Sequence, residues 1–182
     1  MVRGTTLAGA YLLHRLVQAM PADRVYLNVG VWHGFSFFAP LIGNPGKTCV
    51  GVDHFMEFGQ KVGKQEFEEL FTRLKRPGAE FYEMDFESFF RGFDRKIGVY
   101  YYDAEHSYAS HFKAMALASP HLDVGSYVVI DDVDRIDVYR AIFDFLIQSG
   151  EFQNYQVVLD LKTASPFHPT WHCGVVVLKK VR

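Results

Sequence analysis

Apolar and polar residues alternate along this chain in two periodicities that follow one another almost without interruption. Short, mostly apolar runs predict β-strands, whereas apolar residues spaced three and four apart predict helices. The predicted strands are residues 25–29, 48–53, 79–83, 97–102, 127–131, 155–159 and 174–179. The predicted helices are residues 7–20, 35–42, 64–74, 86–91, 107–119 and 138–148. The chain is therefore expected to alternate strand and helix from its first strand onward.

This alternation sets the expected fold class. Several predicted strands are apolar on both faces, which is typical of a parallel sheet covered by helices on each side. Only residues 162–172, with Pro166 and Pro169, separate the last two strands, which is too short for a covering helix. Those two strands should pair as an antiparallel hairpin. We expect a single domain over residues 1–182 with an α/β, doubly wound, Rossmann-like fold, whose seven-stranded sheet is mostly parallel and ends in that hairpin.

Composition narrows the class of partner. The chain has 19 basic and 21 acidic side chains spread along its length, which does not suggest a surface for nucleic acid or for an anionic membrane. No apolar run is long enough to span a bilayer, and the first residues lack a secretory signal. We expect a cytoplasmic protein with a small-molecule substrate, and homo-oligomer formation stays open. Cys49 and Cys173 have no paired spacing and are interpreted as free thiols.

The segment after the first predicted strand has the pattern of a nucleotide-binding loop. The apolar run 25–29 ends at Gly30, and a second glycine, Gly34, precedes a predicted helix. A backbone without side chains at these positions can approach a ligand closely, and the start of a helix offers free N–H groups. Asp53 ends the next strand, where its carboxylate can accept hydrogen bonds from two ribose hydroxyls. The ligand is therefore expected to contain a ribose.

Polar side chains also follow the other predicted strands. In an open parallel sheet, ligands bind beyond the carboxyl ends of the strands, near the point where the strand order reverses. A single aspartate at a strand end is equally well explained by structure, because aspartate is a poor strand former. Polar groups at five strand ends on one edge favour a ligand site. These groups are Asn28, Asp53 with His54, Asp85, Asp103 with His106, and Asp131 with Asp132.

Four sequence blocks, taken in order, resemble one known family. They are residues 28–36 (NVGVWHGFS), 51–53 (GVD), 102–108 (YDAEHSY) and 125–132 (GSYVVIDD). In these blocks the chain resembles a class I S-adenosylmethionine-dependent methyltransferase, of the small branch (methyltransferase domain 24 type) that includes metal-dependent sugar O-methyltransferases. The resemblance covers residues 25–132, and the expected hairpin fits the family's reversed last strand. It implies methyl transfer from S-adenosylmethionine to a hydroxyl of a small molecule.

The resemblance also implies roles for individual residues. Asp53 would hold the ribose hydroxyls, and Asp85 with Phe86 would flank the adenine. A divalent cation, magnesium first of all, is implied at Asp103, Asp131 and Asp132. His106 would take the proton of the acceptor hydroxyl, so that Asp103 and His106 form the catalytic pair. The full set of implied cofactor contacts is Asn28, Gly30, Gly34, Ser36, Asp53, His54, Asp85, Phe86 and Asp103.

Two other functions stay open on the sequence alone. The family usually has an acidic residue where this chain has Asn28, and loss of that negative charge weakens attraction for a cationic sulfonium. The alternative is therefore a catalytically inactive cofactor-binding or scaffold protein with the same fold. A nicotinamide-dependent oxidoreductase would share the ribose-binding role of Asp53. It is disfavoured because residues 30–34 lack the compact three-glycine spacing that a pyrophosphate requires.

Several neighbouring residues have simpler structural explanations. Asp134 and Asp137 are predicted to lie at the start of the last helix and to complement its dipole. The three tyrosines at 100–102 are expected in the core. Trp171 could contact substrate, pack within its loop or meet a partner subunit. Acceptor specificity is expected to come from the first helix, residues 55–63, residues 162–172 or another subunit.

Overall fold

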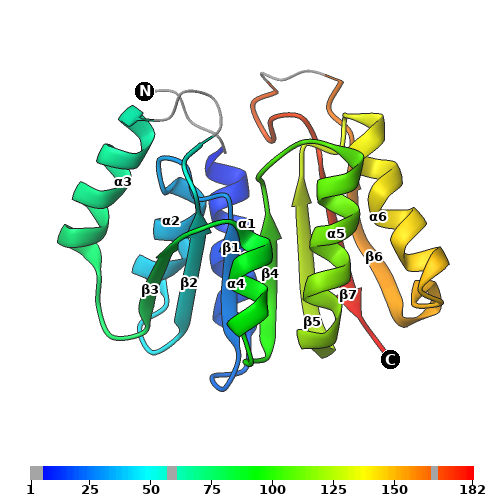
Figure 1. Cartoon of the computed structure of the whole chain (residues 1–182), viewed down its shortest axis with the longest axis horizontal. Coiled ribbons are helices and arrows are strands. Elements are labelled where there is room, and N and C mark those ends of the chain that lie inside the picture. Colours follow the sequence, from blue (N-terminus) through cyan, green and yellow to red (C-terminus); the bar gives the residue numbers. More distant parts are fainter. Residues whose placement is uncertain (1–5, 57–60, 165–167) are drawn as a thin grey trace.

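The computed structural model describes residues 6–56, 61–164 and 168–182. Its strands form one sheet in the order β3-β2-β1-β4-β5-β7-β6 (Figure 1). The strands are β1 (Val25–Val29), β2 (Thr48–Asp53), β3 (Ala79–Glu83), β4 (Ile97–Tyr102), β5 (Leu122–Asp131), β6 (Tyr155–Leu161) and β7 (Val175–Lys180). The helices are α1 (Leu7–Ala19), α2 (Phe35–Gly43), α3 (Lys61–Leu74), α4 (Phe86–Gly92), α5 (Tyr108–Ala118) and α6 (Ile136–Gln148), with short 3-10 turns η1 (Ser119–His121) and η2 (Phe152–Asn154).

Strand pairing confirms the expected fold class. The strands β3, β2, β1, β4 and β5 run parallel to one another, whereas β7 pairs antiparallel with both β5 and β6. The strand order reverses between β1 and β4, which are neighbours at the centre of the sheet. Asn28 of β1 lies in register with Gly51 of β2 and with Tyr101 of β4. The carboxyl ends of β1 and β4 therefore flank the switch point at which such folds bind ligands.

Helices cover both faces of the sheet (Figure 1). Helices α1, α2 and α3 pack on one face around Tyr26, Phe37 and Phe67. Helices α4, α5 and α6 pack on the other face, where Met115 and Ile142 belong to a second core cluster. All residues of β1 and of β4 are buried, because these central strands are covered on both sides. That two-sided burial explains why their sequences are mostly apolar rather than alternating, with Asn28 the polar exception in β1.

Several element boundaries differ from the sequence prediction by one to three residues, and the start of β5 differs by more. Strand β5 begins at Leu122 rather than at residue 127. Its pairing with β4 shifts register between Ile97 and Val99, and Gly125 inside the strand has a φ of 91°. A glycine accepts that left-handed conformation at little cost, so the strand continues through an irregular step that periodicity does not reveal. Helix α6 begins at Ile136 rather than at residue 138.

Asp134 does not have the helix-start role that we predicted. Arg135 is the N-cap of α6, and no side chain makes the capping hydrogen bond. The carboxylate of Asp134 instead accepts hydrogen bonds from the N–H and the hydroxyl of Thr163, at 2.9 and 2.8 Å. Asp137 lies in the first turn of α6, as expected for a residue that complements the helix dipole. Asp134 therefore ties the segment after β6 to the end of β5.

The segments expected to determine acceptor specificity are described only in part. Residues 57–60 and 165–167 lie outside the described residues, as do residues 1–5, on which the absence of a secretory signal was judged. In the described remainder, the hydroxyl of Thr6 donates to the carbonyl of Thr170 at 2.5 Å, which joins the start of α1 to the β6–β7 connection. Within the described ranges, no helix combines the length and the apolar character needed to cross a membrane.

Candidate functional site

The carboxyl ends of the parallel strands lie along one edge of the sheet, the upper edge in Figure 1. Gly30 follows β1 at this edge with a φ of 84°. A Cβ on Gly30 would lie 1.8 Å from the carbonyl oxygen of Asp103, so the end of β1 rests directly on the backbone that follows β4. Glycine is required here by a contact within the protein, whereas its predicted approach to a ligand stays a prediction.

Gly34 is the N-cap of α2 and has a φ of 90°. A Cβ on Gly34 would lie 2.3 Å from the ring of Phe38 and 2.9 Å from the ring of Phe67. The glycine thus lets α2 start close to its own second turn and to α3. Its expected contact with a cofactor is not tested by this geometry.

Asp53 holds the loop that contains these glycines. Its Oδ2 accepts hydrogen bonds from the N–H groups of Val31 and Trp32, at 3.0 and 2.9 Å. Its Oδ1 accepts a hydrogen bond from the N–H of Phe55 at 2.8 Å. An ionised carboxylate has about four acceptor positions, so these three bonds leave room for a further donor such as a ribose hydroxyl. The predicted ribose-binding acid therefore also fixes the loops after β1 and β2.

Asn28 is fully buried beside the start of α2. Its Nδ2 donates to the hydroxyl of Ser36 at 2.8 Å, and the carbonyl of Ser36 accepts a hydrogen bond from the hydroxyl of Tyr26 at 3.0 Å. Among the residues that the structure describes, the buried Oδ1 of Asn28 has no hydrogen-bond partner. Such an acceptor is costly to leave unpaired, and it is free to receive a donor from a ligand. Asn28 and Ser36 thus form a connected pair at the edge where the cofactor is expected.

The bulky residues of this loop are directed at α3. A Cβ on Gly63 of α3 would lie 3.0 Å from the ring of Trp32 and 3.6 Å from the imidazole of His33. The Nδ1 of His33 lies 2.6 Å from a carboxylate oxygen of Glu66. The side chains of Trp32 and His33 therefore fasten the loop to α3.

The other residues expected near the cofactor make mainly local bonds. The Nδ1 of His54 accepts a hydrogen bond from the N–H of Met56 at 3.0 Å. Asp85 is exposed and caps α4, where its carboxylate accepts a hydrogen bond from the N–H of Ser88 at 2.8 Å. The ring of Phe86 meets that of Tyr102 edge-on, with centroids 5.5 Å apart. Their expected contacts with the cofactor stay predictions.

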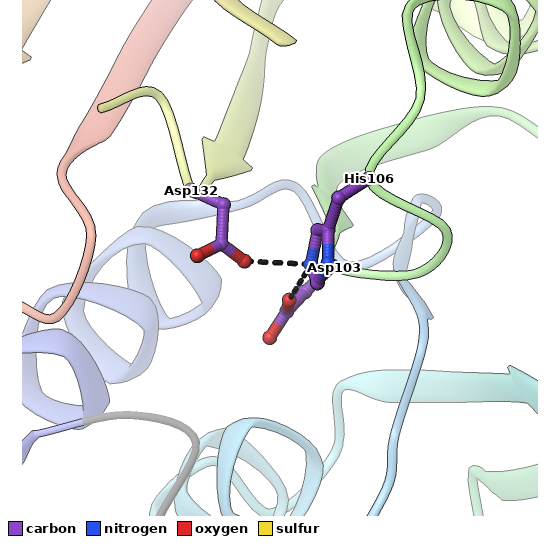
Figure 2. Close-up of side chains that lie close together, drawn as sticks. All are labelled: Asp103, His106 and Asp132. Atoms are coloured by element: carbon purple, nitrogen blue, oxygen red, sulfur yellow. Dashed lines mark ion pairs between the residues drawn. The ribbon is translucent and has the colours of Figure 1, made fainter. Parts of the chain in front are cut away.

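Three polar side chains converge where β4 and β5 end (Figure 2). Asp103 follows β4, His106 lies in the same connection, and Asp132 follows β5. The Nε2 of His106 lies 2.7 Å from Oδ2 of Asp132 and 3.5 Å from Oδ1 of Asp103. All three side chains are partly buried, at 18–23% exposure, so solvent screens their charges less than at a free surface. We call Asp103, His106 and Asp132 the strand-end cluster.

Charge interactions between His106 and the two aspartates shift the pKa values of this cluster. Burial lowers the pKa of the His106 imidazole, but the hydrogen bonds and negative charges of Asp103 and Asp132 outweigh burial and raise it to about 10. Burial raises the pKa of the Asp103 carboxyl, and the hydrogen bond with His106 offsets only part of that effect. Burial also raises the pKa of the Asp132 carboxyl. The hydrogen bond with His106 and the positive charge of its imidazole outweigh burial and lower this pKa below its usual value. His106 and Asp132 therefore form an ion pair.

Asp131 lies apart from the cluster although it adjoins Asp132 in sequence. It is 3% exposed, and its Oδ1 accepts hydrogen bonds from the indole N–H of Trp171 and from the N–H of Asp132, at 2.8 and 2.9 Å. Its Oδ2 lies 2.5 Å from the hydroxyl of Tyr101. Burial raises the pKa of the Asp131 carboxyl well above its usual range, and the charges of Asp103 and Asp132 raise it further. The structure therefore gathers two of the three predicted metal ligands and turns the third inward.

Tyr101 and Trp171 both bond to Asp131, whereas the sequence placed Tyr101 only in the core and left three roles open for Trp171. The tyrosines at 100–102 are all buried, as expected, but the hydroxyl of Tyr101 also reaches Asp103 at 3.2 Å and so links both acids. Strand alternation gave a signal, because a residue two positions before a strand-end aspartate shares its face. Nothing local could place Trp171 against Asp131, because Asp131 ends β5 whereas Trp171 lies in the connection between β6 and β7.

The strand-end cluster fits a divalent cation. One ligand atom from each of Asp103, His106 and Asp132 can be chosen so that all three lie within 4.8 Å of one another. Carboxylate oxygens and an imidazole nitrogen are ordinary metal donors. Within the described residues, Asp131 does not join this group. The donor set can therefore hold a cation with open positions for water or for a substrate oxygen.

Solved structures identify the architecture as the class I methyltransferase fold. A protein from Corynebacterium glutamicum superposes with a TM-score of 0.75 at 14% identity, covering 100% of this chain and 84% of its own. An O-methyltransferase from Bacillus cereus in complex with S-adenosylhomocysteine superposes with a TM-score of 0.71 at 14% identity, covering 96% and 82%. An rRNA methylase from Streptococcus thermophilus has a TM-score of 0.66 at 12% identity, covering 100% and 99%. At such identities the likeness shows a shared fold.

Sequence comparison supplies the family. A family model described as a methyltransferase domain matches residues 27–133, which is more than half of the chain. The chain therefore belongs to this methyltransferase family, as its four sequence blocks predicted. A search of curated protein sequences finds no match.

Proposed function

We propose that this protein transfers a methyl group from S-adenosylmethionine to a hydroxyl group of a small molecule, with the help of a divalent metal ion. One observation carries the proposal beyond the family. Gly30, in the loop expected to hold the cofactor, rests on the backbone of Asp103, the first residue of the strand-end cluster. The place for the methyl donor and the group able to orient an acceptor hydroxyl therefore adjoin each other.

The cofactor is expected along the ends of β1 and β2. Asp53 has acceptor capacity left for the ribose hydroxyls after it has bonded three backbone N–H groups. The unpartnered Oδ1 of Asn28 can receive a hydrogen bond, although an amide brings no charge to attract the sulfonium. Asp85 and Phe86, at the start of α4, are the proposed neighbours of the adenine.

Methyl transfer requires the acceptor oxygen, the methyl carbon and the sulfonium sulfur to lie in line. The bond from the methyl carbon to the acceptor oxygen forms as the bond from that carbon to the sulfonium sulfur breaks, and the acceptor hydroxyl passes its proton to a basic group of the strand-end cluster. The sulfur leaves as the neutral thioether of S-adenosylhomocysteine. A divalent cation held by Asp103 and Asp132 would make the acceptor hydroxyl more acidic. His106, which with Asp103 is the predicted catalytic pair, would take that proton only after the proton of its ion pair with Asp132 has left.

Calorimetric titration tests the cofactor. The purified protein is titrated with S-adenosylmethionine and with S-adenosylhomocysteine, each with and without Mg²⁺. We expect both ligands to bind, and Asp53→Ala to abolish binding. Asp94→Ala is the matched control, because Asp94 is exposed and precedes β4 at the opposite edge of the sheet. If neither ligand binds the folded wild-type protein, the inactive scaffold alternative is favoured instead.

A second assay tests the acceptor. Transfer of a labelled methyl group from S-adenosylmethionine is measured to sugars, to phenols and to an RNA. Binding of S-adenosylmethionine and of S-adenosylhomocysteine is measured on the same preparation. A near-neutral formal charge of −2 favours a small molecule over a polyanion. Transfer to the RNA alone would contradict the proposed substrate class while leaving the methyltransferase activity intact.

A further inference from the structure

We propose that the imidazole of His106 is itself a metal ligand, completing a site of one histidine and two aspartates that prefers borderline ions such as Zn²⁺ or Co²⁺ to Mg²⁺. This inference rests on the metal dependence within the proposed function. It replaces the sequence prediction in two respects, because Asp131 leaves the ligand set and His106 ceases to be the proton acceptor.

The first argument is the spacing of the donor atoms. Two ligands that bind one cation at about 2.1 Å and at a right angle lie about 3 Å from each other. The Nε2 of His106 lies 2.7 Å from the oxygen of Asp132 and 3.5 Å from that of Asp103, on either side of this value. Figure 2 shows the imidazole edge directed at both carboxylates. A cation can therefore enter with small side-chain movements, in place of the proton that the imidazole shares with Asp132 in the ion pair.

The second argument is that the carboxylate of Asp131 faces away from the other donors. Its two oxygens meet the indole N–H of Trp171, the N–H of Asp132 and the hydroxyl of Tyr101. Trp171 is buried, so turning the carboxylate toward the cluster would leave the indole N–H without this acceptor. Asp131 therefore anchors the β6–β7 connection and the end of β4.

The third argument is the backbone at Asp132. Its φ is 58°, a left-handed conformation that non-glycine residues seldom adopt. The chain therefore turns sharply after β5, and Asp131 points into the core while Asp132 points into the cluster. Strained backbone of this kind persists where surrounding structure holds it, and it gathers at functional sites. The turn decides which of two adjacent aspartates can meet a cation.

The donor set decides the class of ion. Mg²⁺ favours oxygen ligands and binds imidazole poorly, whereas imidazole nitrogen suits Zn²⁺, Co²⁺ and similar ions. With three protein ligands, such an ion keeps open positions for water or a substrate oxygen. The contribution of His106 should accordingly be large for Zn²⁺ or Co²⁺ and small for Mg²⁺.

Metal titration by calorimetry tests the assignment without any turnover. Chelator-treated wild-type protein, His106→Ala and His106→Gln are each titrated with Zn²⁺, Co²⁺ and Mg²⁺; the glutamine variant keeps the side-chain size in case the alanine variant folds poorly. We expect both variants to lose at least about 100-fold in Zn²⁺ and Co²⁺ affinity, since loss of an outer partner alone costs about 10- to 100-fold. Mg²⁺ affinity should change by less than about threefold. His121→Gln, at the opposite edge of the sheet, controls for stray histidine binding.

Two further outcomes decide against the proposal. If Zn²⁺ affinity is unchanged or rises in folded His106→Gln, the imidazole acts as a base or as a built-in cation and not as a ligand. If Asp131→Asn, still folded, loses as much affinity as His106→Gln, Asp131 belongs to the ligand set after all. Binding of S-adenosylhomocysteine is measured on the same samples. Its absence in wild type overturns the proposed function, whereas the metal titrations judge the ligand set independently.

Discussion

Replacing Asp53 by asparagine is expected to weaken both the fold and cofactor binding. The carboxylate accepts three backbone hydrogen bonds, from the N–H groups of Val31, Trp32 and Phe55, at 2.8–3.0 Å. An amide of the same shape has only one oxygen. Its best orientation keeps the two bonds to Val31 and Trp32 and turns an NH₂ group toward the N–H of Phe55. Asp53→Asn thus removes one acceptor and the charge that strengthens the other two bonds.

The cost follows from these three bonds. An N–H left unpaired away from water costs about 1–3 kcal/mol, and a bond to a charged acceptor contributes about 1 kcal/mol more than a neutral one. Asp53 is only partly buried, so water can replace some of the lost bonding. We therefore expect a loss of about 2–3 kcal/mol in the free energy of unfolding. With a urea dependence of about 2 kcal/mol/M, the unfolding midpoint should fall by about 1–1.5 M.

Urea unfolding with and without S-adenosylhomocysteine separates the two roles of Asp53. Wild type, Asp53→Asn and the control Asp94→Asn are compared, and a ligand at 100 times its Kd adds about 2.7 kcal/mol to a protein that binds it. We expect the ligand to raise the midpoint of wild type and of Asp94→Asn only. The reasoning is refuted if Asp53→Asn unfolds within about 0.3 M of wild type without ligand, a change too small for the loss of an acceptor.

Three further changes test other contacts by urea unfolding. Gly30→Ala should lower the free energy of unfolding by more than about 3 kcal/mol, because its Cβ would lie 1.8 Å from the carbonyl oxygen of Asp103. Gly92→Ala should lower it far less, because a Cβ there would meet no described atom within 4 Å. Equal losses would contradict this. Burial lowers the pKa of His111, in α5, to about 4, below its unfolded value of about 6.5. The neutral ring therefore stabilises the fold fully above pH 6.5, and that contribution, up to about 3 kcal/mol, is lost as the pH falls toward 4. His111→Gln should flatten the pH dependence of the midpoint over this interval, and identical slopes would count against it. Trp171→Phe should cost about 1–3 kcal/mol by removing the donor to Asp131, and an unchanged midpoint would show that the bond contributes nothing.

The sequence determined the elements and their class because burial imposes its periodicity locally. The runs 25–29 and 97–102 are mostly apolar because both faces of a central strand are covered, and the structure places β1 and β4 there. The short connection with its two prolines left no room for a helix, so the final antiparallel pairing was also predictable. Asp53 and Asp103 could be singled out in the same way, because polar residues that end apolar strands of a parallel sheet share one edge.

Only the tertiary structure decided what those residues contact. Gly30 could be recognised as a special position, but the group that a Cβ there would meet at 1.8 Å is the backbone of Asp103, far away in sequence. Asp131 and Asp132 are identical and adjacent, and a left-handed turn at Asp132 determines which of them faces the cluster. Trp171 meets Asp131 because the β6–β7 connection packs back on the end of β5. Periodicity is set by near neighbours along the chain, whereas the partner of a buried polar group is set by how separate elements pack.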